Sequence, residues 1–125
     1  FFSLRIGSDC GDELMTIQFK APIEDEGEPQ SVVVHTFTTD SQSVELKSKK
    51  MSRDQDGDYS VDLGDGDALI SVKNCNLIDT RGQTACYVRK VDSDVLELEA
   101  TFLLDDIRLF ALGIASFLPH KYNKM

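Results

Sequence analysis

Apolar and polar residues alternate along most of the chain, which is the pattern of β-strands that bury one face. Residues 13–20 place Met15, Ile17 and Phe19 on one side of a strand and polar side chains on the other. Residues 94–104 alternate in the same way, and their apolar side carries Leu96, Leu98, Ala100 and Phe102. Further segments with strand character are residues 31–38, 43–48, 59–63, 68–73 and 84–91. The pattern therefore predicts a mostly antiparallel sheet of about five to seven strands.

The spacing changes near the C-terminus, where apolar residues recur at helical intervals. Asp105 or Asp106 suits the start of a helix, because the carboxylate accepts hydrogen bonds from the first free N–H groups. Pro119 suits its end. The apolar stripe in between consists of Ile107, Phe110, Ala111, Ile114, Ala115 and Leu118. We therefore predict an α+β fold in which one C-terminal amphipathic helix packs on the sheet.

The length of 125 residues is that of one domain, so residues 1–125 are treated as a single unit with one modest core. Apolar residues make up 41% of the chain and charged residues 28%, which is typical of a globular protein. Because the chain starts at Phe1 without a Met, we expect an excised or processed fragment of a longer polypeptide.

The net charge of −9 argues against nucleic acid as a partner, because affinity for phosphate backbones comes largely from Lys and Arg. No stretch approaches the ~20 apolar residues of a membrane-spanning helix, so we expect no membrane insertion by this fragment. A protein or peptide is then the expected partner, and the oligomeric state stays open.

The sequence shows no recognisable catalytic motif. Cys10, Cys75 and Cys86 have no C-x-x-C spacing. They permit one disulfide and one free thiol, or three buried thiols in a reducing compartment. No G-x-S-x-G elbow and no phosphate-binding glycine loop occurs. We therefore expect a protein that is not an enzyme and has no resident cofactor, with calcium as the one candidate ion.

The stretch DQDGDYSVDL raises the question of calcium, because it carries carboxylates at Asp54, Asp56, Asp58 and Asp62. Calcium takes six to eight oxygen ligands, and Asp side chains at alternate positions of a tight turn can deliver several of them to one point. The spacing resembles the calcium loops of integrin-type β-propeller repeats. Asp and Gly are also common in solvated hairpin turns. The sequence leaves both interpretations open.

A strand ending in an Asp-aliphatic pair, a short apolar strand and a Cys-Tyr-hydrophobic triplet follow one another at residues 61–63, 68–70 and 86–88. Residues 103–122 then read as a closing helix that ends in Leu-Pro shortly before an aromatic residue. This order resembles the BRICHOS domain, and the resemblance spreads over about four-fifths of the chain.

The chain departs from the BRICHOS pattern in three places, one of which is the spacing from Asp62 to Cys86, longer than the family usually shows. The family normally bonds the Cys of its Cys-Tyr pair to a Cys in the closing helix, and the matching position here is Ala115. Cys86 would then pair with Cys10 or Cys75, or remain free. The stretch between Cys86 and the closing helix is also too short for the family's first helix.

The resemblance implies a non-catalytic lumenal or extracellular domain of the secretory pathway that binds β-prone segments of client or proprotein chains in a chaperone-like way. An uncovered sheet edge would pair with the extended client. The client-binding candidates are Tyr59, Val61, Asp62, Ala85 and Tyr87. Burial of Asp62 would favour its neutral form and make binding pH-sensitive, whereas an exposed Asp62 would be an ordinary turn carboxylate.

The competing interpretation is an extracellular adhesion or receptor-binding β-domain. Its acidic loops, residues 23–28 and 54–67, would form the binding surface and attract a basic protein partner. Dependence of binding on salt or calcium would favour this class. Suppression of client aggregation at ordinary salt would favour the chaperone class.

Overall fold

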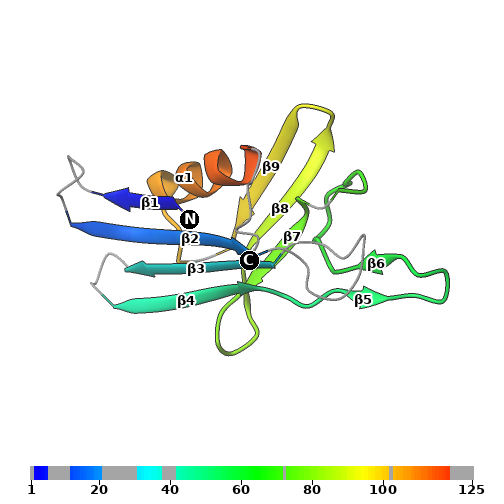
Figure 1. Cartoon of the computed structure of the whole chain (residues 1–125), viewed down its shortest axis with the longest axis horizontal. Helices are drawn as coiled ribbons and strands as arrows, with labels where there is room; N and C mark the ends of the chain where they lie inside the picture. The colour runs from blue at the N-terminus through cyan, green and yellow to red at the C-terminus, as the bar shows by residue number, and fades with distance from the viewer. Residues whose placement is uncertain are drawn as a thin grey trace, which may run out of the picture.

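The structure is a computed structural model that describes residues 2–5, 12–20, 31–37, 42–71, 73–101 and 103–118. In this part of the chain, seven strands form one antiparallel sheet, two form a small ribbon, and one helix follows them (Figure 1). The sheet strands are β1 (Phe2–Arg5), β2 (Glu13–Lys20), β3 (Ser31–Phe37), β4 (Ser43–Ser48), β7 (Cys75–Ile78), β8 (Thr84–Asp92) and β9 (Val95–Ala100). The ribbon and the helix are β5 (Ser52–Arg53), β6 (Tyr59–Ser60) and α1 (Asp106–Phe117). The predicted α+β fold is confirmed.

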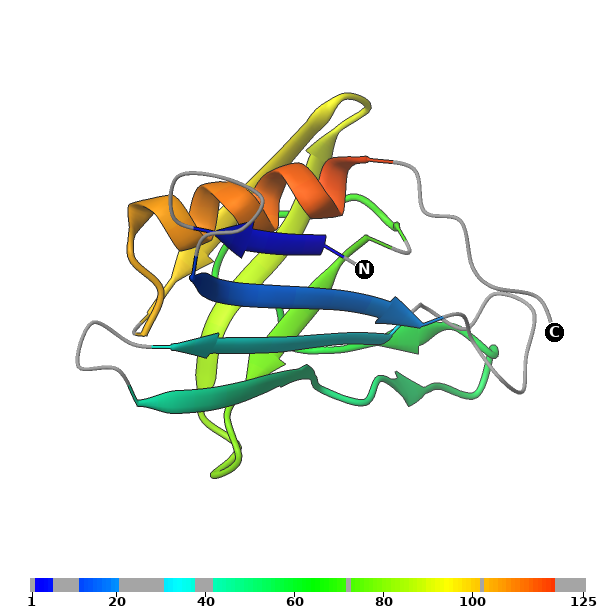
Figure 2. The same cartoon turned by 60° about the vertical axis from the view of Figure 1, so that its left-hand side comes forward.

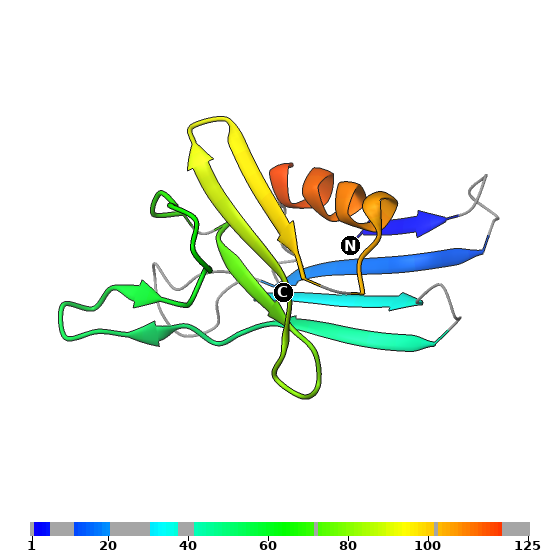
Figure 3. The same ribbon diagram turned by 180° about the vertical axis from the view of Figure 1, so that it is seen from behind.

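The sheet is a meander in the order β1-β2-β3-β4-β7-β8-β9, and each pair of neighbours is antiparallel. The ribbon of β5 and β6 is an excursion between β4 and β7 that projects beyond the sheet (Figure 3). The sheet curls, so that β1 and β2 at one end and β9 at the other all contact α1 (Figure 2). The helix therefore lies across the open side of the curled sheet.

The hydrophobic core fills the concave face of the sheet beneath the helix. The strand register sets Ile17 opposite Val34 and Val34 opposite Leu46, and all three side chains are buried. The helix adds Leu112 and Ala115, each 1% exposed. Because side chains alternate along a strand, the same register turns the polar neighbours to the convex face. The period-two pattern of the sequence thus becomes one apolar layer.

The predicted packing face of the helix is wrong in part. Ile107, Phe110 and Ile114 belong to the predicted stripe, yet they are exposed in the structure. The buried residues of α1 are Arg108, Leu112, Ala115 and Ser116. The helix is apolar on more than one face. Its orientation against the curled sheet buries a face that includes an arginine, Arg108.

Two predicted strands are also corrected. Of residues 59–63, only Tyr59–Ser60 is a strand, and it belongs to the ribbon rather than the sheet. Of residues 68–73, those that the structure describes, 68–71 and 73, form no strand. Leu69 donates its N–H to the Lys90 carbonyl over 2.7 Å, and its own carbonyl accepts from the Asn74 side chain over 2.7 Å. These bonds satisfy the backbone of Leu69 outside any ladder of paired strands.

Some sequence predictions fall outside the described residues: those that concern Cys10, residues 23–28, Phe102 and Pro119. In the part that is described, no helix is both long enough and apolar enough to cross a membrane.

Candidate functional site

The outer face of α1 is the most unusual surface of the described structure. It consists of Ile107, Phe110, Ile114, Phe117 and Leu118, which are between 42% and 66% exposed. Single exposed apolar residues are normal on a protein surface, whereas a contiguous group of them is a candidate interaction site. These side chains follow one another along a single side of the helix, so they form a continuous apolar strip.

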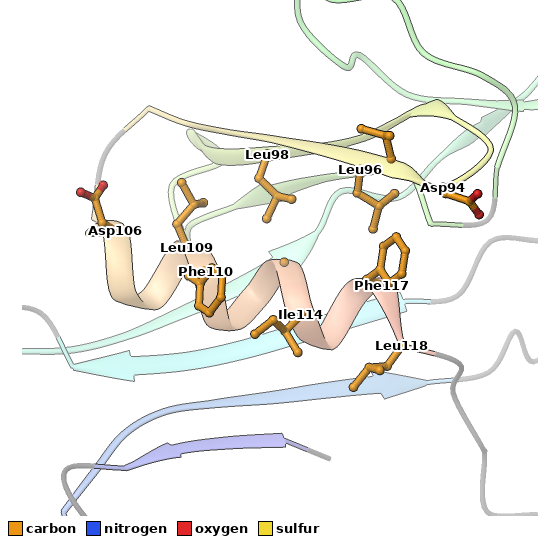
Figure 4. Close-up of a pocket in the computed structure, with 11 residues that line it drawn as sticks. Asp94, Leu96, Leu98, Asp106, Leu109, Phe110, Ile114, Phe117 and Leu118 are labelled. Atoms are coloured by element: carbon orange, nitrogen blue, oxygen red, sulfur yellow. The ribbon is translucent and has the colours of Figure 1, made fainter.

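A groove runs between this strip and β9, with a volume of about 590 Å³ (Figure 4). We call it the β9–α1 groove. Its lining is apolar apart from one carboxylate toward each end, and the lining residues are Asp94, Val95, Leu96, Leu98, Asp106, Leu109, Phe110, Gly113, Ile114, Phe117 and Leu118. A volume of several hundred cubic ångströms is in the range of ligand-binding pockets.

The alternation of β9 supplies one wall of the groove. Leu96 and Leu98 point toward α1 in Figure 4, while Glu97 and Glu99 lie on the opposite face of the strand. A Cβ placed on Gly113 would lie 3.5 Å from Leu98 Cδ1, so the helix and the strand come close at this point. β9 is the last strand of the sheet order among the described residues, and β8 is its one strand neighbour there.

The buried Arg89 holds β9 from the convex side. Its guanidinium donates to Glu97 at 2.6 and 3.0 Å, and it forms an ion pair of 2.9 Å with Glu99. It also donates to the carbonyl of Leu63 over 2.6 Å, which ties residues 62–67 to the back of the sheet. The hydrogen bond to Glu97 raises the pKa of Arg89. Arg89 is 3% exposed and fully paired, so it acts as a structural anchor.

A close packing distance explains a glycine in the loop that covers Arg89. A Cβ on Gly66 would lie 2.7 Å from Arg89 Nε, which is closer than real Cβ contacts come. In the sequence GDGD, residues 64–67, the second glycine is therefore explained by its close packing against Arg89. The convex side of β8 is closed by this loop, whereas the concave side of β9 opens into the groove.

Both ends of α1 are fixed, so the groove is preformed. At the first turn, the Asp105 carboxylate accepts from the N–H of Arg108 over 3.0 Å and from its guanidinium over 2.6 Å. Arg108 Nε also donates to Thr36 Oγ1 over 3.0 Å, which links the helix to β3. At the last turn, Lys73 Nζ donates to the carbonyl of Ser116 over 2.6 Å. Burial, with Lys90 nearby, lowers the pKa of Lys73.

The link between β9 and α1 contains a further constraint. Leu103 has a φ of +72°, in the left-handed region that residues other than glycine rarely adopt. It is half-buried and packs against the core. This strained residue turns the chain back so that α1 runs alongside β9 (Figure 4).

The predicted client-binding residues do not form one surface. Tyr59 and Val61 line a second hollow of about 420 Å³, between the ribbon and residues 68–71. Ala85 is 0% exposed and lies in the core. Tyr87 lies on the convex side of β8, against the Arg89 guanidinium. Asp62 is exposed and its carboxylate accepts from the N–H of Gly64 over 2.9 Å, as expected of a turn carboxylate.

Residues 54–58, the first part of the acidic stretch, form the tip of the β5–β6 ribbon. Asp54 Oδ1 accepts from the backbone N–H groups of Asp56 and Asp58, each over 2.9 Å, and Gly57 has a φ of +85°. Within the described residues, no three acidic, histidine or cysteine side chains converge on a point suited to a metal ion. Calcium binding by Asp54, Asp56, Asp58 and Asp62 stays a prediction.

The hairpin between β7 and β8 forms the same turn without the extra carboxylates. Asp79 Oδ1 accepts from the N–H groups of Arg81 and Gln83, each over 2.9 Å, and Gly82 has a φ of +84°. Asp at the first position and Gly at the fourth are therefore what this turn requires. The carboxylates of Asp56 and Asp58 occupy positions where Arg and Gln serve equally well.

Cys75 and Cys86 are both buried free thiols on the concave face. Burial raises the pKa of each thiol to about 12. A thiol held in its protonated form is a poor nucleophile and a poor metal ligand. The predicted disulfide partners of Cys10 are thus free in the structure, and Cys10 itself lies outside the described residues.

Comparisons with protein-family models, curated proteins and solved structures return no match for this chain. The BRICHOS resemblance therefore stays a prediction from the sequence.

Sequence reasoning missed the groove because it assigned Phe110 and Ile114 to the core. A signal was available, since Leu109, Leu112 and Phe117 lie outside the predicted stripe and are also apolar. A 12-residue helix with apolar residues around most of its circumference has more apolar surface than one sheet face can cover.

Proposed function

We propose that this chain is a non-catalytic binding domain that holds an extended, β-prone segment of another polypeptide in the β9–α1 groove. The observation that carries the proposal is the apolar strip of α1 lying exposed beside the last strand of the sheet. Binding there would shield apolar segments of a client or proprotein from self-association, as the BRICHOS resemblance also implies.

The backbone of β9 supports this assignment. In an antiparallel sheet, alternate N–H and C=O groups of an end strand point away from its neighbour and are free to pair with an added strand. Here the place where such a strand would lie has an apolar wall on its helix side, formed by residues such as Phe110 and Phe117. Backbone pairing would give affinity and the apolar wall would select β-prone side chains.

The proposal includes a location in the secretory pathway or outside the cell, because that is where domains of the resembled family act. The partner is a protein or peptide, and neither nucleic acid nor an inserted membrane segment is part of the proposal. Catalysis has no role in it.

The test is the growth of fibrils by an amyloid-forming peptide, followed by thioflavin fluorescence with the domain at sub-stoichiometric concentration. The wild-type domain is expected to delay growth, and the double variant Phe110→Ser/Ile114→Ser to lose most of the delay. Ile70→Ser is the matched control, because Ile70 is fully exposed outside the groove and lines the second hollow. Wild-type protein that causes no delay would refute the proposal.

A second candidate function is supported by comparing the turn that begins at Asp54 with the similar turn that begins at Asp79. Asp56 and Asp58 are exposed at the tip of a projecting ribbon, and the turn at Asp79 shows that their carboxylates are not needed for its geometry. Carboxylates placed in this way could attract a basic protein partner, with or without calcium. Binding that disappears at high salt, or on chelation, and that survives Phe110→Ser/Ile114→Ser would favour this extracellular interaction domain instead.

A further inference from the structure

We infer that the segment taken up by the β9–α1 groove is a short apolar strand flanked by a basic residue at each end. This inference rests on the proposed function and adds the chemistry of the partner. It is carried by Asp94 and Asp106, the two charged residues that line an otherwise apolar groove.

The two carboxylates lie at opposite ends of the groove (Figure 4). Asp94 lies in the turn between β8 and β9, beside the last turn of the helix, whereas Asp106 is the first residue of the helix. Both are exposed, and neither carboxylate has a hydrogen-bond or ion-pair partner among the described residues. Neighbouring Asp105 differs, because the helix cap and Arg108 occupy its carboxylate.

The length of the groove sets the length of the occupant. β9 has six residues, which at about 3.3 Å per residue extend roughly 20 Å. The 12 residues of α1 extend about 18 Å at a rise of about 1.5 Å per residue. An added strand that runs the length of both walls would therefore contain about six residues, with its flanking residues near Asp94 and Asp106.

Charge favours a segment of another polypeptide over a second copy of this chain as the occupant of the groove. No Lys or Arg lines it, and the whole chain carries a net charge of −9. A second copy of the chain would bring its own Asp94, Asp106 and net negative charge to the same surface, so like charges would oppose a symmetric pair. A foreign segment with Lys or Arg at its ends would meet opposite charges instead.

The experiment uses three synthetic peptides that share a central segment of alternating valine and threonine and end in lysine, glutamine or glutamate on both sides. Their affinity for the whole domain is measured by fluorescence anisotropy at low and at high salt. The lysine-flanked peptide is expected to bind about 3- to 10-fold more tightly than the glutamate-flanked one, because each exposed ion pair contributes a small factor. High salt should reduce this preference.

Variants locate the source of the preference. Asp94→Asn/Asp106→Asn should bind the three peptides about equally, and Asp94→Lys/Asp106→Lys should prefer the glutamate-flanked peptide. Asp56→Lys/Asp58→Lys is the matched control, because it makes the same change in net charge on the distant ribbon and should leave the preference for lysine intact. A control variant that abolishes the preference would overturn the inference, since the whole-chain charge would then be its cause.

The outcomes separate the inference from the proposed function. Tight binding of all three peptides without preference would overturn the inference and leave the proposed function standing. No binding of any of the three peptides would overturn the proposed function. Sedimentation that shows a dimer dissociated by Phe110→Ser/Ile114→Ser would identify a second copy as the occupant and overturn the inference.

Discussion

The two sides of α1 differ in burial, although the sequence makes both of them apolar. The side toward the sheet buries Leu112, Ala115 and the charged Arg108, whereas the outer side exposes the larger Phe110 and Ile114. Burial of apolar surface stabilises a fold, and burial of a charge is unfavourable unless it is paired. The inner side therefore contributes to stability, whereas the outer side leaves apolar surface exposed that contributes little to it.

Truncation on the two sides should produce the largest contrast. Leu112→Ala is expected to lower the free energy of unfolding by about 2–5 kcal/mol, because it leaves a cavity in the core. Phe110→Ala should lower it by no more than about 1 kcal/mol, because its ring is already 66% exposed. Urea denaturation followed by circular dichroism measures both values. Equal losses at the two positions would contradict the assignment of roles to the two sides.

The anchor at the start of the helix should give an intermediate effect. Asp105→Ala removes the acceptor for the Arg108 N–H and the partner of its guanidinium, so we expect a loss of about 1–2 kcal/mol in the same unfolding experiment. Asp105→Asn keeps a capping oxygen and should lose less. If both variants were as stable as the wild type, the helix would not be fixed in the manner described.

The buried thiols beneath the helix should have the smallest effect on the free energy of unfolding at neutral pH, where they are protonated in both the folded and the unfolded chain. They also report whether the core beneath the helix excludes solvent. Burial raises the pKa of Cys75 and Cys86 to about 12, against 9.0 when exposed. Between these values the unfolded chain loses protons that the folded chain retains, so the free energy of unfolding falls as pH rises from about 9 toward about 12. The double variant Cys75→Ala/Cys86→Ala should show a shallower fall.

Alkylation provides the matched comparison at pH 8.5. A cysteine introduced as Ile114→Cys on the outer side should react with iodoacetamide in the folded protein, whereas Cys75 and Cys86 should react only after denaturation. Peptide mapping by mass spectrometry separates the sites. Rapid labelling of Cys86 in the native state would show that the inner layer opens.

The helix and the strands β2, β3, β4, β8 and β9 could be predicted from the sequence because each depends on local periodicity, whereas the short strands β1 and β7 were not predicted. Residues such as Met15 and Ile17 alternate, and the register of the sheet then follows from burying one face. The strand predicted over residues 68–73 is wrong. Its apolar residues looked like a strand, but the Asn74 side chain and the Lys90 carbonyl bind the backbone of Leu69. Side-chain bonds from outside a segment leave no mark in its own pattern.

The excess of apolar residues around the helix was visible in the sequence, but the position of the groove could not be predicted because it depends on which side of the helix meets the sheet. Phe110 and Leu112 are equally apolar in sequence, and the turn at Leu103 and the contact of Arg108 with Thr36 decide which one is buried. The placement of Asp94 and Asp106 at the two ends of one groove could not be predicted either, because β9 and the turn into α1 separate them in the chain. The Asp54 turn, by contrast, follows from a local motif that Asp79 repeats.

Amide hydrogen exchange in the presence of the lysine-flanked peptide tests the central claim most directly. If the peptide adds a strand to β9 within the β9–α1 groove, outward-pointing amides of Val95–Ala100 should gain protection on binding, with smaller changes along the outer face of α1. The turn at Asp79 should show no change. Binding that leaves the exchange of β9 unaltered and protects the β5–β6 ribbon instead would contradict the account.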